Sequence, residues 1–192
     1  MAEIKSALEI ALEKAERYGR ATKEELLQDQ HQEKGRQLAV QFLKEEGDLE
    51  AELANLPPEA QAAAQQAAKE VLIRNISLPR DESVDPRAAR ALEGLLLVAS
   101  NQKGMTRLKE EVENIWQQFL VARNGARQQL KASFSQQLRN VTQALEAQYG
   151  QRLQVEVEHL PQFQEEWRKF EANLMQQYEP ILEDRKARMA TL

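Results

Sequence analysis

The fold is decided by the longest periodic stretch of the chain, residues 105–149, which reads MTRLKEEVENIWQQFLVARNGARQQLKASFSQQLRNVTQALEAQY. Apolar side chains recur in it at a mean spacing of about 3.7 residues. This spacing is typical of one face of an α-helix that is straight or has a slight right-handed supercoil. A single helix of this length would extend over about 66 Å. The members of this apolar stripe are Met105, Leu108, Val112, Ile115, Phe119, Ala122, Ala126, Leu130, Phe134, Leu138, Val141, Leu145 and Tyr149.

The dipeptide Asn124-Gly125, in the middle of the stretch, leaves two alternatives open. Both residues tolerate left-handed φ, so the chain could turn there and fold back as a hairpin. The apolar stripe keeps its helical phase across the dipeptide, which favours one continuous helix. We therefore predict one very long helix over about 105–149.

The composition of the whole chain also favours helices. Its 192 residues include 26 Ala and 23 Gln against 7 Gly and 6 Pro, and strand-forming side chains are scarce. These proportions exclude a β-sandwich and a Rossmann domain. Aromatic residues at helical spacing follow Pro161, which opens a further helix. The prediction is an all-α fold, an elongated helical bundle with coiled-coil-like packing, one very long helix and a C-terminal helix from about 161.

The domain organisation predicted from the sequence is a single helical domain over 1–192. Within it, residues 1–56 could form an N-terminal helical arm, and Pro57-Pro58 marks the start of the next helix. The segment 77–85 is the clearest loop. Asp85-Pro86 then suits the N-cap and the first position of a helix, since Asp accepts hydrogen bonds from free N–H groups and Pro needs no donor there.

The absence of Cys and of long apolar segments excludes several classes of protein. With no Cys, the chain has neither disulfides nor thiolate metal sites. The most apolar run, Leu95–Ala99, is far shorter than the roughly 20 residues that a membrane span needs, and the N-terminus lacks the apolar core of a signal peptide. The expectation is a cytoplasmic protein with no membrane association.

Few residues suit catalysis or metal binding. His31 and His159 are the two histidines, and Glu156 precedes His159 with the Glu-x-x-His spacing of di-iron bundles. Such a site needs a second copy of the motif and further carboxylates, so a solvated histidine is the simpler interpretation. No phosphate-binding glycine loop or nucleophile elbow occurs. We expect a protein that is not an enzyme, with no catalytic residues, no metal and no cofactor.

Residues 114–145 of the long predicted helix contain no acidic side chain. Arg123, Arg127 and Lys131 recur there at every fourth residue, so they form a row on one face of the helix. The row could be a plain solvated face, or it could pair with the acidic stretch Glu45–Glu59, within one chain or across a dimer. Alternatively, it could follow a nucleic-acid backbone, although the net charge of −5 and the lack of interleaved aromatics disfavour nucleic acid as a partner. The candidate interaction row consists of Arg123, Arg127, Lys131 and Arg139.

The length of the apolar stripe suggests a function. A compact globule of 22.0 kDa is shorter than the stripe, so part of the stripe would need cover from another molecule. The sequence therefore predicts a non-catalytic helical interaction or scaffold protein, self-associating as a homodimer or other homo-oligomer, with a further protein as another partner. The alternative is a nucleic-acid-associated accessory protein that uses Arg123, Arg127 and Lys131.

The N-terminal segment IKSALEIALEKAE, Ile4–Glu16, resembles the start of a group of small bacterial helical proteins that are uncharacterised. The resemblance implies a bacterial, cytoplasmic origin. It implies no function and no site residues.

Overall fold

The computed structural model describes residues 23–149 and 156–192, with only the helical course given for 140–149. Ile4–Glu16 lies outside the described residues. The described part is all-α, as predicted, and contains no strand. Its elements are α2 (Lys23–Leu43), α3 (Leu49–Ala54), α4 (Pro58–Arg74), α5 (Pro86–Val98), α6 (Gln102–Tyr149), the short 3₁₀-helix η1 (Val157–His159) and α7 (Pro161–Ala190).

The chain groups into two compact units, Met1–Ala68 and Lys69–Leu192, and the boundary falls within α4. The single domain expected over 1–192 stays a prediction, as does the helical arm over 1–56.

In the first unit, α2 ends in a turn that only a few residue types adopt readily. Glu45 has a φ of 65°, in the left-handed region. The N–H of Glu46 donates to the Gln41 carbonyl and that of Glu45 to the Phe42 carbonyl, which is the Schellman pattern of a helix end. Asp48 then caps α3 by accepting from the N–H of Ala51. The apolar spacing from Leu38 to Leu56 is therefore divided between two helices.

Helix α2 has few apolar side chains, and a close approach to α4 holds it in place. Residues 28–37 lack an apolar side chain, yet they lie within α2. Gly35 is buried, and a Cβ built on it would lie 2.0 Å from the Ala64 carbonyl oxygen. The alanine-rich face of α4, with Ala60 and Ala64 buried, permits this contact because its side chains are small.

We predict that Gly35→Ala destabilises the first unit by about 1–3 kcal/mol, because α2 and the backbone of α4 would have to separate. Intrinsic helix propensity alone predicts the opposite, a gain of about 1 kcal/mol. The measurement is thermal unfolding followed by circular dichroism at a concentration too low for association. The matched control is Gly125→Ala, where a Cβ would meet no atom within 4 Å and stability should rise. A stabilised Gly35→Ala variant would show that the two helices do not approach closely.

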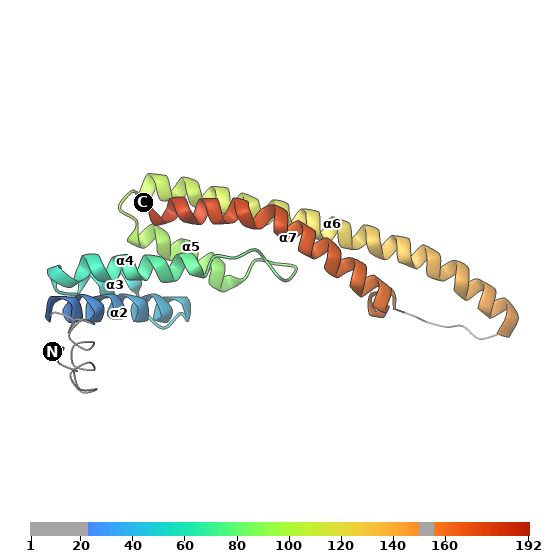
Figure 1. Ribbon diagram of the computed structural model, residues 1–192, viewed down its shortest axis with the longest axis horizontal. Coiled ribbons are helices and arrows are strands. Elements are labelled where there is room, and N and C mark those ends of the chain that lie inside the picture. The colour runs from blue at the N-terminus through green and yellow to red at the C-terminus, as the bar shows by residue number, and fades with distance from the viewer. Residues whose placement is uncertain (1–22, 150–155) are drawn as a thin grey trace, which may run out of the picture. The chain divides into compact units, whose positions relative to one another are not determined.

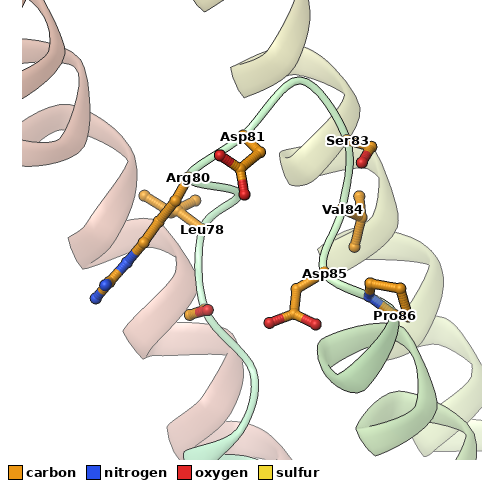
Figure 2. Close-up of a pocket in the computed structure, with 8 residues that line it drawn as sticks. Leu78, Arg80, Asp81, Ser83, Val84, Asp85 and Pro86 are labelled. Atoms are coloured by element: carbon orange, nitrogen blue, oxygen red, sulfur yellow. The ribbon is translucent and has the colours of Figure 1, made fainter.

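The second unit contains the loop predicted at 77–85, which lies between α4 and α5 without regular secondary structure. The N–H of Arg87 donates to Asp85 Oδ1 over 2.8 Å, and Pro86 is the first residue of α5. Figure 2 shows the loop curving around a hollow into which Asp85 points, while Arg80 points away from it. Leu78 is buried and anchors the loop to the unit.

The very long helix is continuous. Figure 1 shows α6 as one unbroken ribbon, and Asn124 and Gly125 lie inside it. It begins three residues earlier than predicted, because Asn101 accepts a hydrogen bond from the N–H of Gly104 and so caps its first turn. The hairpin alternative at Asn124-Gly125 is wrong, since uninterrupted apolar spacing outweighs the turn preference of two residues.

Helix α7 packs antiparallel along α6, side by side with it in Figure 1. Phe119 meets Tyr178 edge to face with 5.5 Å between ring centroids, and Phe134 meets Phe163 in the same way at 5.7 Å. As residue numbers rise along α6, the numbers of their partners fall along α7. Pro180 lies inside α7, which nevertheless continues to Ala190 because Leu182 and Met189 are buried beyond it.

The apolar stripe of α6 therefore finds much of its cover within the same chain. Its burial is complete near the start of α6 and decreases along the helix. Buried members are Met105, Leu108, Val112, Ile115 and Phe119. Half-buried members are Ala122, Ala126, Leu130, Phe134 and Leu138.

Candidate interaction site

Arg123 is one of the two buried charged side chains among the described residues of the second unit, 8% exposed. Its Nε and Nη2 donate to Glu171 Oε1 on α7 over 2.9 and 2.7 Å. Its Nη1 donates to the backbone carbonyl of Asp81, in the loop before α5, over 3.0 Å. One guanidinium thus joins α6, α7 and the loop, using donors in a planar fork that Lys could not reproduce.

The face of Trp167, on α7, carries two guanidinium groups. The Cζ atoms of Arg123 and Arg127 lie 5.5 and 5.9 Å from its ring centroid, within the range of cation–π attraction. On the same helix, Phe170 stacks with Trp167 at a centroid distance of 5.8 Å. The basic row and the aromatic side chains of α7 therefore form one cluster.

The next members of the basic row meet carboxylates from other parts of the second unit. Arg127 pairs with Glu82 of the loop at 3.4 Å and with Glu158 of η1 at 3.3 Å. Lys131 reaches the same Glu158 oxygen at 3.5 Å. These acidic partners were not singled out in the sequence, and the predicted pairing with Glu45–Glu59 stays a prediction. Arg139 lies about two turns beyond Lys131 on an exposed part of α6.

An apolar groove runs along another face of α6, beside Val84 and Ala89. Its volume is about 640 Å³. Val121 is 68% exposed, the highest value among the large apolar side chains of the described residues. The lining contributed by α6, hereafter the outer face, consists of Glu113, Trp116, Gln117, Leu120, Val121, Asn124, Gly125 and Gln128.

A polar hollow of about 430 Å³ continues the groove, since Asn124 and Gln128 line both. Its other walls carry the charges of Arg127, Lys131 and Glu158. The groove thus has an apolar centre, and a charged hollow adjoins one end of it. A partner that covers it needs apolar contact in the middle and compensating polar groups towards the end of α6.

The Glu-x-x-His motif lies at the surface. His159 Nδ1 is 3.2 Å from Glu156 Oε2, and both side chains are about three-quarters exposed. Within the side chains that the structure describes, no group of three or more acidic or histidine residues could hold a metal ion.

The exposed face of α7 offers a contrast to the Arg123 cluster. Lys169 Nζ lies 3.0 Å from Glu165 and 3.1 Å from Glu166. The hydrogen bond from Lys169 lowers the pKa of Glu165, and the hydrogen bonds to both carboxylates raise the pKa of Lys169. Because this group lies in solvent, water and salt screen it, and it contributes little to stability.

We predict that Glu171→Gln lowers the free energy of unfolding of the second unit by about 1.5–3 kcal/mol, because Arg123 would lose its charged acceptor while staying buried. Urea denaturation followed by tryptophan fluorescence reports on this unit, since both Trp residues lie in α6 and α7. Glu165→Gln, on the same helix, is the exposed control and should leave the midpoint unchanged. Equal midpoints for the two variants would contradict a structural role for the Arg123 pair.

The fold and the site together define an all-α protein built on an antiparallel helical hairpin that presents an apolar groove. A family model matches residues 50–191, and the chain belongs to that family, a family of unknown function (DUF6657). The matched range lies beyond Ile4–Glu16, the segment that resembles bacterial helical proteins. Neither the curated proteins nor the solved structures contain a significant match. In the described part of the chain, no helix has the length and apolar character needed to cross a membrane.

Proposed function

We propose that this protein is a non-catalytic helical interaction protein of the bacterial cytoplasm that self-associates as a homodimer through the outer face of α6. The observation that carries the proposal is the apolar groove beside Val121, a side chain that is 68% exposed. Contiguous exposed apolar surface is typical of interaction sites. The sequence suggested self-association because the apolar stripe needed cover. In the structure α7 supplies much of that cover, so the proposal depends on the groove instead of the stripe.

A second copy is the proposed occupant because the outer face carries its own complement. Exposed Val121 lies beside Gly125, where no neighbouring atom lies within 4 Å of an added Cβ. A protruding side chain and an open position on one surface suit a twofold interface, in which the same patch serves both chains. Coiled-coil-like packing between chains would then add to the contact that α6 makes with α7.

The alternative is a nucleic-acid-associated accessory protein that uses Arg123, Arg127 and Lys131. These three side chains engage Glu171, Glu82 and Glu158, so a phosphate would have to displace carboxylates. Phosphate binding is favoured by accessible cations, because they release the counterions of the nucleic acid. Cations already held in ion pairs are less accessible, so these pairs disfavour nucleic-acid binding relative to self-association.

Sedimentation equilibrium of the full chain tests the proposal. We expect a mass twice the 22.0 kDa of one chain at micromolar concentration. Val121→Glu should shift the mass towards the monomer, because a carboxylate would be buried without a partner. Ala172→Glu, at an exposed position of α7, is the control and should stay dimeric. A monomer at every concentration would overturn the proposal.

A further inference from the structure

The loop between α4 and α5 is fixed at both ends and held less firmly in its middle. Leu78 and Pro79 are buried at one end, and Asp85 caps α5 at the other. Residues 80–84 between them are exposed, apart from half-buried Val84. Within the part of the chain that the structure describes, no backbone–backbone hydrogen bond involves these five residues. The segment 80–84, hereafter the strap, can therefore open while the helices on either side stay folded.

Two arginines of α6 hold the strap by contacts of different strength. Arg123 is buried and donates from Nη1 to the backbone carbonyl of Asp81 over 3.0 Å. Arg127 pairs with Glu82 over 3.4 Å, but the Glu82 side chain is 79% exposed, so water and salt weaken this pair. The hydrogen bond from Arg123 is therefore the stronger of the two contacts that keep the strap closed.

The strap borders three hollows, so its position determines their shape. It lines the hollow of about 440 Å³ that Figure 2 shows, together with residues at the two ends of the loop. Val84 also lines the apolar groove beside α6, and Glu82 lines the polar hollow that adjoins the groove. If the strap moved outwards, the groove would lose the wall that Val84 contributes, and the polar hollow would lose one carboxylate.

Arg123 also connects the strap to α7. The same guanidinium donates to Glu171 Oε1 from Nε and Nη2, over 2.9 and 2.7 Å. These two hydrogen bonds fix the plane of the guanidinium and so direct Nη1 towards the Asp81 carbonyl. Without Glu171 the side chain would be free to rotate, and the strap would lose its hydrogen bond for part of the time. Docking of α7 and closure of the strap therefore favour each other, because the linkage between two events is reciprocal.

We propose that the strap opens and closes in the folded protein, that Arg123 holds it closed, and that Glu171 on α7 stabilises the closed state through Arg123. The closed strap completes the apolar groove with Val84, whereas the open strap exposes the hollow that it lines. The ion pair that joins α6 to α7 thus also controls the shape of the groove. This inference does not require self-association, because every contact in it lies within one chain.

Tryptic cleavage after Arg80 measures opening of the strap, because a protease cuts a folded chain only where the segment around the bond opens. Arg123→Lys keeps a charge beside Glu171 but lacks the planar fork that reaches Asp81 as well. We expect it to speed cleavage after Arg80 at least about tenfold, since the strap loses a hydrogen bond from a charged donor. Arg168→Lys, at an exposed position of α7, is the matched control and should leave the rate unchanged.

The other cleavage products separate opening of the strap from unfolding of the whole unit. Mass spectrometry identifies each cut, and cleavage after Lys109, inside α6, should stay slow in the Arg123→Lys protein. Equal acceleration at both bonds would show that the unit unfolds as a whole and would overturn the inference. Cleavage after Arg80 at the same rate with and without Arg123 would overturn it too, because Arg123 would then not hold the strap.

A second variant tests the connection to α7 with Arg123 left in place. Glu171→Gln should speed cleavage after Arg80 about threefold or more, because the guanidinium loses the charged acceptor that orients it. Glu165→Gln, exposed on the same helix, should leave the rate unchanged. An unchanged rate in Glu171→Gln would overturn the role of α7 in closing the strap. A chain that is a monomer at every concentration would overturn the proposed self-association and would leave these measurements unaffected.

Discussion

The ion pair between Arg123 and Glu171 fixes how the second unit is assembled. Two donors of one guanidinium bind a single carboxylate oxygen on the opposite helix, and a third donor holds the backbone of the loop before α5. Sliding α7 by one turn along α6 would leave a buried charge without its acceptor, which the apolar contacts alone would not prevent. The aromatic pairs along the hairpin stabilise the contact between α6 and α7. Arg123 determines which residues of the two helices lie opposite each other and where the loop before α5 lies.

This division of roles gives α6 two faces with different uses. The side with the apolar stripe meets α7, and Arg123 and Arg127 lie over Trp167 there. The outer face, around Val121 and Gly125, lines an apolar groove that Val84 and Ala89 border on its other side. A hairpin whose inner face is settled in register can present its outer face as a rigid surface, so that association costs little conformational entropy. The proposed self-association therefore uses the outer face and not the apolar stripe that packs against α7.

The sequence predicted the helices well and the side-chain pairings poorly. The period of the apolar stripe predicted α6, and Asp85-Pro86 and Pro161 located the starts of α5 and α7, because these signals are local. Arg123 and Glu171 are 48 residues apart, so their contact depends on the hairpin register, which the sequence does not specify locally. The apolar stripe does not predict the groove, because Leu120 and Val121 lie outside the stripe. Two large apolar residues next to Phe119 were the available signal for a second apolar face.

A double-mutant cycle between Arg123 and Glu171 tests most directly whether this pair organises the hairpin. Both residues are replaced by Met, singly and together, and the free energy of unfolding is measured by tryptophan fluorescence in urea. We expect a coupling energy of at least about 1.5 kcal/mol, because the double variant should lose less stability than the sum of the two single losses. A coupling below about 0.3 kcal/mol, which is the additivity of independent sites, would contradict it.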